Sequence, residues 1–435
     1  MRRAALKSLL LPIAYSMLKP RFFYSLLLYL LLPFIPLRLL WRGRKQPAYL
    51  KYWRERFGWY GIVPPAPLIW IHAVSVGETR ACVPLIAALQ AHYPEHAILL
   101  THMTPTGRET GQTLFGTRVL QAYLPYDFPG AVQRFIKHFK PSFGLLMETE
   151  LWPNLIATCR QRQIPLALIN ARLSARSARG YARLAALSRE ALQALTLVSA
   201  QTAADAERLT QLGARDIAIT GNLKFDVVPP PATDQLRNLF GVERRVLLAA
   251  STREGEEALL LDAFSKPIPN QLLVIVPRHP QRFNAVAALL TTRGINFQRR
   301  SENKPISVDT PVVLGDSMGE MFAYYGAAEV AIIGGSLLPF GGQNLIEACA
   351  LGVPVILGPH THNFAQVAED AVKAGAALRV PDAHAALAQA QALLVDTEKR
   401  TGMHAAALKF AADHRGAVDK TMALIAEKLL KAPEI

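Results

Sequence analysis

The chain has 435 residues and a formal net charge of +15 at pH 7, and this length predicts two domains rather than one. Residues 1–56 hold twelve Lys and Arg residues but only one acid. Because the positive charge is concentrated at this end, composition argues against a nucleic-acid-binding surface and for a basic segment beside an anionic surface. Cys82, Cys159 and Cys349 form no CxxC pair, which argues against disulfides or zinc and for a reducing compartment.

A charge-free run, FFYSLLLYLLLPFIPL, occupies residues 22–37. As a helix it would extend about 24 Å, which is short of the ~30 Å bilayer core, and Pro33 and Pro36 are expected to kink its end. No small-residue cleavage site follows, which argues against a signal peptide. Basic and aromatic residues do follow, as is typical of the cytoplasmic membrane interface. We interpret residues 1–45 as a membrane anchor and basic segment, either a short span or an in-plane helix; a buried core helix is the alternative.

From residue 67 to residue 220, apolar runs that are typical of buried parallel strands alternate with helical patterns. The first run, PLIWIHAVS, precedes an expected turn at 76–79 and a helix, and the second run begins at His96. Further strands are expected at 118–123, 143–148, 165–169, 196–200 and 216–220. The alternation predicts a doubly wound parallel sheet, whose functional groups lie at the carboxyl ends of the strands.

Acidic residues follow two of these strands directly. Glu78 is either an ordinary acid in the first turn of a helix or a functional carboxylate. Glu148 and Glu150 end the fourth strand, and alternation predicts that they point to the same side. Glu150 is interpreted as a cap of the helix that begins near Pro153. One carboxylate beside an acceptor hydroxyl is what general base catalysis requires.

Basic residues follow the later strands. Four arginines at helical spacing predict one charged helix face, which is either solvated or a site for an anionic, phosphorylated lipid: Arg172, Arg176, Arg179 and Arg183. Lys224 is either a surface lysine or a functional cation after a strand. The Pro-rich segment at 227–235 is typical of an interdomain linker.

The same pattern of strand, loop and helix returns at residues 244–264, where Ser251–Arg253 lie at a strand end. The strand within 271–283 ends in the turn PRHP, which suits a phosphate but is equally an ordinary surface turn. Residues 312–363 predict strand, helix, strand, Gly-rich loop, helix and strand. A Gly-rich loop before a helix N-terminus is a common cradle for anionic groups.

Two further pairs of residues lie in this last stretch. Asn344 and Glu347, three positions apart, predict either a capping box with Asn344 as N-cap or a site in which Glu347 accepts ribose hydroxyls beside a phosphate. His360 and His362 lack further ligands at regular spacing, so no metal site is expected.

Several motifs carry a family resemblance that covers most of the chain. The segments SVGE, ETELWPN, GNLKFD, PRHP, GDSMGEMF, GGSL, NLIEA and GPHTHNF resemble those of 3-deoxy-D-manno-octulosonic acid (Kdo) transferases, which place Kdo on lipid A. The resemblance implies an α/β fold of the GT-B type, in which two Rossmann-like domains face each other across a cleft. The expected architecture is this GT-B fold preceded by an N-terminal membrane anchor helix.

The resemblance also implies roles for the residues at the matched positions. It makes Glu78 the general base, Glu148 a group that shapes the transition state or holds the base, and Lys224 a cation that offsets charge on the leaving phosphate. Contacts with CMP are implied for Pro277, Arg278, Met318, Gly319, Glu320, Asn344, Leu345, Ile346 and Glu347. No metal and no cofactor are expected.

We therefore expect an anchor at 1–45, an acceptor domain at 46–226, a CMP-sugar domain at 227–410 and a helix at 411–435 that crosses back to the first domain. The expected function is inverting transfer of Kdo from CMP-Kdo to lipid IVA, at the cytoplasmic side of a bacterial inner membrane and without nucleic acid. The alternatives are a GT-B transferase for a UDP- or ADP-sugar, such as a heptosyltransferase, and a non-catalytic, membrane-tethered nucleotide-binding protein.

Overall fold

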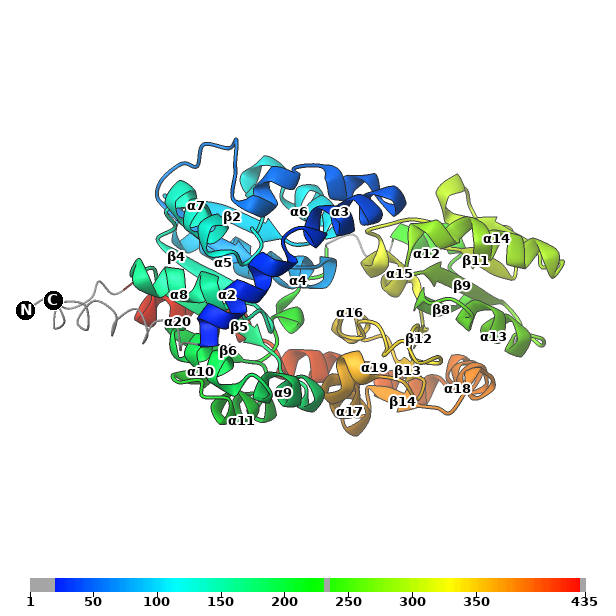
Figure 1. Ribbon diagram of the computed structural model, residues 1–435. Coiled ribbons are helices and arrows are strands. Elements are labelled where there is room, and N and C mark those ends of the chain that lie inside the picture. The colour runs from blue at the N-terminus through cyan, green and yellow to red at the C-terminus, as the bar shows by residue number, and fades with distance from the viewer. Residues whose placement is uncertain (1–19, 231–234, 431–435) are drawn as a thin grey trace, which may run out of the picture. The chain divides into compact units, whose positions relative to one another are not determined.

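The structure is a computed structural model that describes residues 20–230 and 235–430. By its contacts the chain divides into two compact units, one made of Met1–Asp226 with Gly416–Ile435 and the other of Val227–Arg415. Within the described residues each unit holds one seven-stranded sheet, and the paired strands are parallel (Figure 1). The expected α/β class with two parallel sheets is confirmed.

The sheet of the first unit has the order β3-β2-β1-β4-β5-β6-β7. Its strands are β1 (Leu68–His72), β2 (Ala97–His102), β3 (Leu120–Tyr123), β4 (Phe143–Met147), β5 (Leu166–Ala171), β6 (Leu197–Ala200) and β7 (Ile217–Ile219). The strands expected from the seven apolar runs therefore all form. The order reverses between β1 and β4, and the crevice at such a switch point is where open α/β sheets bind ligands.

Helices cover both faces of this sheet. They are α4 (Val76–Ala81), α5 (Val83–His92), α6 (Pro105–Phe115), α7 (Pro129–Phe139), α8 (Pro153–Gln161), α9 (Ala175–Ala182), α10 (Ala185–Gln193), α11 (Ala203–Gln211) and α20 (Ala417–Lys428), with short 3₁₀ turns at η1 (Pro47–Leu50), η2 (Trp53–Phe57), η3 (Gly116–Arg118) and η4 (Leu223–Asp226). Leu68 and Trp70 of β1 pack with α7 and α8. Ile69 and Ile71 belong to a second core with α5 and α20, because neighbouring strand residues point to opposite faces. The helix near the C-terminus, red in Figure 1, thus belongs to the first unit.

One local prediction is wrong. Residues 76–79 are not a turn between strand and helix but already belong to α4. The helix begins early because Glu78 turns back and accepts the backbone N–H of Val74 at 2.7 Å and the hydroxyl of Ser75 at 3.0 Å. A Ser followed three residues later by Glu is a helix-start signal.

The charge-free run forms two helices, α2 (Pro20–Leu31) and α3 (Phe34–Lys45), rather than one. Among the described residues, no single helix has the length and apolar character needed to cross a membrane, although α2 and α3, bent by 57°, meet those criteria as a pair. An anchor is therefore not established. The alternative of a buried core helix is wrong, since α2 has no buried residue. Residues 1–19 of the expected anchor segment lie outside the described part of the chain.

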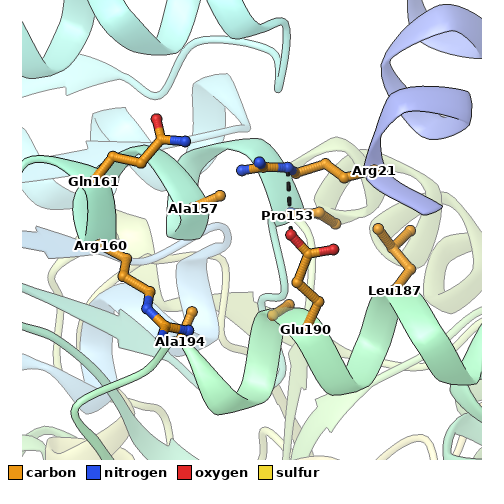
Figure 2. A pocket seen from close by; sticks show the side chains of 9 residues that line it. Arg21, Pro153, Ala157, Arg160, Gln161, Leu187, Glu190 and Ala194 are labelled. Atoms are coloured by element: carbon orange, nitrogen blue, oxygen red, sulfur yellow. Dashed lines mark ion pairs between the residues drawn. The ribbon is translucent and has the colours of Figure 1, made fainter. Parts of the chain in front are cut away.

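Helix α2 is held to the first unit by its polar side. Arg21 Nε lies 3.5 Å from the Glu190 carboxylate on α10, beside a hollow of about 100 Å³ between α2, α8 and α10 (Figure 2). The Ser25 hydroxyl donates to Asn154 Oδ1 at 3.1 Å. The exposed residues of α2 and α3 are mainly apolar: Phe22, Phe23, Leu26, Leu27, Tyr29, Leu30, Leu31, Phe34, Leu37, Leu40 and Trp41. We call these eleven residues the apolar face.

The sheet of the second unit has the order β10-β11-β9-β8-β12-β13-β14. Its strands are β8 (Arg245–Thr252), β9 (Gln271–Pro277), β10 (Phe297–Arg299), β11 (Val312–Leu314), β12 (Val330–Ile333), β13 (Val355–Leu357) and β14 (Ala377–Arg379). The order reverses between β8 and β12, so this sheet has its own switch point.

The helices of the second unit are α12 (Gln235–Phe240), α13 (Glu256–Ala263), α14 (Phe283–Thr292), α15 (Met321–Ala327), α16 (Ile346–Ala350), α17 (Ala365–Lys373), α18 (Ala383–Val395) and α19 (Thr397–Asp413), with 3₁₀ turns at η5 (Pro280–Arg282), η6 (Arg300–Glu302) and η7 (His362–Phe364). At the amino end of β8, the buried Arg244 guanidinium donates to the carbonyl oxygens of Asn270, Gln271, Ser307, Val308 and Thr310. These hydrogen bonds stabilise the end of the sheet opposite the switch-point loops.

Candidate functional site

Polar groups of the first unit gather at the carboxyl ends of β1 and β4, which are neighbours in the sheet. Glu78 follows β1, Glu148 follows β4, and Lys224 lies in η4 after β7. The Lys224 Nζ lies 3.0 Å from Glu148 Oε1, and the charge of Glu148 acts on Glu78. The three residues that the family resemblance singles out in this unit are therefore brought together at its switch point.

Glu78 is a buried carboxylate in a fixed orientation. It is 9% exposed, and one of its oxygens accepts the N–H of Val74 while the other accepts the hydroxyl of Ser75. Burial, followed by the negative charge of Glu148, raises the pKa of Glu78 to about 8, against the opposing hydrogen bond from Val74. A carboxyl group with a pKa near physiological pH can accept a proton from a substrate and release it again.

Glu148 is held in an uncommon backbone conformation. Its φ of +57° lies in the left-handed region, which is sparsely populated by residues with a side chain. Its backbone N–H donates to the carbonyl oxygen of Ile169 at 2.9 Å. The strand ends at Met147, so strand alternation does not determine the directions of Glu148 and Glu150, but the charges of both act on Glu78.

The prediction that Glu150 caps α8 is wrong. Glu150 instead accepts the indole N–H of Trp152 at 2.9 Å, and burial raises the pKa of its carboxyl to about 7. The cap comes from Asp127, whose carboxylate accepts the backbone N–H groups of Asn154 and Leu155 at 2.9 and 2.8 Å. This contact is invisible to a local pattern because the cap and the helix are 26 or more positions apart.

Two histidines beneath the site do not stand out in the sequence. His72 ends β1 and His102 ends β2, and both are fully buried. Burial lowers the pKa of His72 to about 3 and that of His102 to about 4. They therefore remain neutral at physiological pH and add no positive charge beneath Glu78.

The four arginines at 172–183 do not form a single helix face. Helix α9 covers only Ala175–Ala182, so Arg172 precedes it and Arg183 follows it. Arg176, Arg179 and Arg183 are exposed. The Arg172 carbonyl oxygen accepts the hydroxyl of Thr149, next to Glu148.

In the second unit, the residues expected to contact CMP lie on loops around its switch point. Pro277 and Arg278 follow β9, Met318–Glu320 follow β11, and Asn344–Glu347 follow the loop after β12. Since β11, β9, β8 and β12 are consecutive in the sheet, their carboxyl-end loops lie along one edge.

Arginines dominate this edge. Arg253, Arg278 and Arg282 all act on His279, whose pKa is lowered by burial first and then by these three positive charges. The Arg278 Nε donates to Gln343 Oε1 at 3.2 Å. Guanidinium groups bind phosphate through paired N–H donors, so this cluster suits an anionic ligand.

The loop after β12 approaches the loop after β8 closely. A Cβ atom at Gly334 would collide with the backbone of Ser251, and Gly335 has a φ of +70°, so both positions favour glycine.

The three expected CMP contacts after β11 lie in different surroundings. Met318 is 52% exposed, Gly319 has a φ of +86°, and Glu320 pairs with Arg300 at 2.9 Å.

The capping-box alternative is confirmed only in part, because Asn344 lies one residue before the cap position but its side chain still accepts a backbone N–H of the helix and contacts Glu347. Helix α16 begins at Ile346, and Leu345 occupies the cap position. The Asn344 side chain accepts the Ile346 N–H at 3.1 Å and donates to Glu347 Oε1 at 3.1 Å. Both side chains are half-buried. They lie at the N-terminal end of a short helix, directly after Gln343, which binds Arg278.

Within the described residues, no three His, Cys, Asp or Glu side chains are grouped as metal ligands.

Two α/β units, each with a parallel sheet, resemble the fold of GT-B glycosyltransferases. The crystal structure of a glycosyltransferase from Rickettsia africae ESF-5 shares this fold, with a TM-score of 0.58 and 14% identity over 84% of this chain and 99% of that one. The family model described as glycosyl transferases group 1 matches residues 258–410.

Sequence comparison identifies the family. The model described as 3-Deoxy-D-manno-octulosonic-acid transferase (kdotransferase) matches residues 51–227. A 3-deoxy-D-manno-octulosonic acid transferase of Bordetella pertussis is 47% identical over 89% of this chain and 95% of its own length. The transferase of the same name from Haemophilus influenzae is 40% identical over 93% and 98%. The chain belongs to the Kdo transferase family and is a glycosyltransferase.

Proposed function

We propose that this enzyme transfers Kdo from CMP-Kdo to lipid IVA, the precursor of lipid A, in lipopolysaccharide synthesis. Relatives that align over nearly all of the chain are named for Kdo transfer. The observation that carries the mechanism is the position of Glu78, a buried carboxylate at the switch point of the first unit, with a pKa of about 8.

In this proposal the second unit binds the donor. Arg278 meets the phosphate of CMP, with Arg253 and Arg282 adding positive charge nearby, and Glu347 accepts hydroxyl groups of the ribose. The proposed cytidylate contacts are the backbone and side chains of Pro277, Arg278, Met318, Gly319, Glu320, Asn344, Leu345, Ile346 and Glu347. The cluster of arginines around His279 supports an anionic ligand at this place.

Glu78 is the proposed general base. Its carboxylate removes the proton from the acceptor hydroxyl while that oxygen forms a bond to the anomeric carbon of Kdo. The bond from the anomeric carbon to the CMP phosphate oxygen breaks in the same displacement, so CMP leaves with the electron pair and the configuration inverts. The two hydrogen bonds from Val74 and Ser75 support this role because they fix the direction of the carboxylate.

Glu148 and Lys224 are proposed to act as a unit. Lys224 offsets negative charge that develops on the departing phosphate, and Glu148, 3.0 Å from its ammonium group, holds it in place. The negative charge of Glu148 also supports the raised pKa of the base. Paired charges that are only partly exposed keep their orientation better than surface pairs.

The apolar face is proposed to rest on the cytoplasmic surface of the bacterial inner membrane, where the amphiphilic acceptor lies. Exposed contiguous apolar surface is uncommon on a soluble protein. The polar side of α2 is occupied by the first unit through Arg21 and Ser25, which favours an in-plane position over a span. Arg38, Arg42 and Arg44 supply charge for anionic headgroups.

The test is transfer by the purified full chain. Mass spectrometry should detect lipid IVA with added Kdo from CMP-Kdo, and no product from UDP- or ADP-sugars. Isothermal titration should give measurable affinity for CMP and weaker affinity for UDP and ADP. Preferred binding of UDP or ADP, together with no Kdo transfer, would favour the heptosyltransferase-like alternative.

A further inference from the structure

Glu256 opens helix α13, directly after the loop that follows β8, and its side chain is 0% exposed. Its carboxylate oxygens accept the backbone N–H groups of Arg253 at 2.8 Å, Gly335 at 2.6 Å, Leu337 at 3.0 Å and Leu338 at 3.4 Å. Three of these four donors belong to the loop after β12. The N–H groups that surround a buried carboxylate replace the water that it loses on folding.

The loop that Glu256 holds, residues 334–343, runs from the end of β12 to Gln343. Its base is closed by two backbone hydrogen bonds, from Gly342 to Gly335 at 2.7 Å and from Gln343 to Gly334 at 3.0 Å. The Arg253 guanidinium covers the ring of Phe340 at 4.6 Å. Glu256 therefore accepts hydrogen bonds from the backbone of a loop whose two ends are hydrogen-bonded to each other.

The last residue of this loop reaches the donor-site arginine. Gln343 Oε1 accepts Arg278 Nε at 3.2 Å, and the backbone N–H of Arg278 donates to the Thr252 carbonyl oxygen at 3.0 Å. Loss of the Glu256 carboxylate would leave buried N–H groups in the loop without acceptors. The loop would then shift to find new partners, and Gln343 would no longer hold the guanidinium in one orientation.

We infer that Glu256 is a positioning residue for donor binding: it fixes loop 334–343, and through Gln343 it aims Arg278 at the donor phosphate. This inference rests on the proposed function, since it takes Arg278 as the phosphate ligand. Glu256 itself need not touch the nucleotide. We expect the loss of Glu256 to affect donor binding more than folding, because the loop that it holds lies at the switch point, beyond the carboxyl end of β12.

The test is isothermal titration of CMP into the full chain carrying Glu256→Gln, which keeps the size of the side chain but puts an N–H₂ group among N–H donors. The dissociation constant should rise at least about tenfold, and the KM for CMP-Kdo should rise while the KM for the acceptor stays within about twofold. Arg244→Met is the matched control. It removes a buried charged group at the opposite end of β8, so it should lower the melting temperature and leave CMP affinity unchanged.

A double mutant identifies the route. If Glu256 acts through Gln343, then Gln343→Ala alone should weaken CMP binding about fivefold or more, and adding Glu256→Gln should cost little further. Wild-type CMP affinity in a folded Glu256→Gln variant would overturn the inference, as would fully additive effects. If Glu256→Gln does not fold, wild-type affinity in Gln343→Ala overturns it instead. Failure of the wild-type chain to bind CMP would contradict the proposed donor, which is a distinct result.

Discussion

Replacement of Glu148 by Gln should move the acid limb of the pH–rate profile to lower pH. Burial and the charge of Glu148 raise the pKa of Glu78 to about 8 from an ordinary value of 4.5, which corresponds to roughly 5 kcal/mol at about 1.4 kcal/mol for each pH unit. With this pKa, roughly one tenth of the molecules carry an ionised Glu78 at pH 7 and roughly one hundredth at pH 6. Wild-type kcat/KM should therefore rise about tenfold for each pH unit below 8.

Removal of the Glu148 charge makes ionisation of Glu78 easier, so the pKa of Glu78 falls toward its ordinary value and the acid limb of the profile moves to lower pH. The maximal rate should fall at the same time, because Lys224 loses its partner at 3.0 Å. The assay is kcat/KM for Kdo transfer between pH 5.5 and 9.5. Glu190→Gln removes the same charge from an acid that pairs with Arg21, and it should leave the limb in place. An unmoved limb in Glu148→Gln would refute the electrostatic coupling between the two acids.

Three other outcomes are expected. Arg278→Lys should raise the dissociation constant for CMP about tenfold or more in calorimetry, because lysine cannot make paired hydrogen bonds to phosphate; unchanged affinity would count against Arg278. Burial raises the pKa of Asp127 to about 7 from 3.8, so this acid favours the folded state at low pH and loses that contribution as pH rises through 7. Asp127→Asn should flatten the fall in urea midpoint between pH 5 and 8, and an unchanged slope would contradict this. The double variant Leu30→Asp, Phe34→Asp should no longer float with anionic phospholipid vesicles, whereas Val242→Asp, at an exposed position of the second unit, should still float. Retained flotation of the double variant would exclude the apolar face as the membrane contact.

Much of the fold could be predicted because buried parallel strands are written as continuous apolar runs. The run at 67–75 forms β1, and AEVAIIGGS contains β12 with its glycine-rich end. The position of Glu78 directly after such a run also indicated a site, since strand ends and switch points are topological features.

The errors fall where contacts are non-local or the backbone is unusual. A positive φ at Glu148 removed the alternation on which its expected direction depended. The α8 cap was missed because Asp127 comes from a different loop. Glu256 escaped notice for the same reason, as its partners in loop 334–343 are about eighty positions away. Ser75 and Glu78, by contrast, carried a readable helix-start signal.

The most direct measurement of the central claim is Kdo transfer from CMP-Kdo to lipid IVA by Glu78→Gln and Glu78→Ala, with CMP affinity measured on the same preparations. The account predicts that turnover falls about 10²- to 10⁴-fold, the usual contribution of a general base, while CMP affinity stays at the wild-type value. Turnover near that of the wild type in both variants would contradict the assignment of Glu78 as the base.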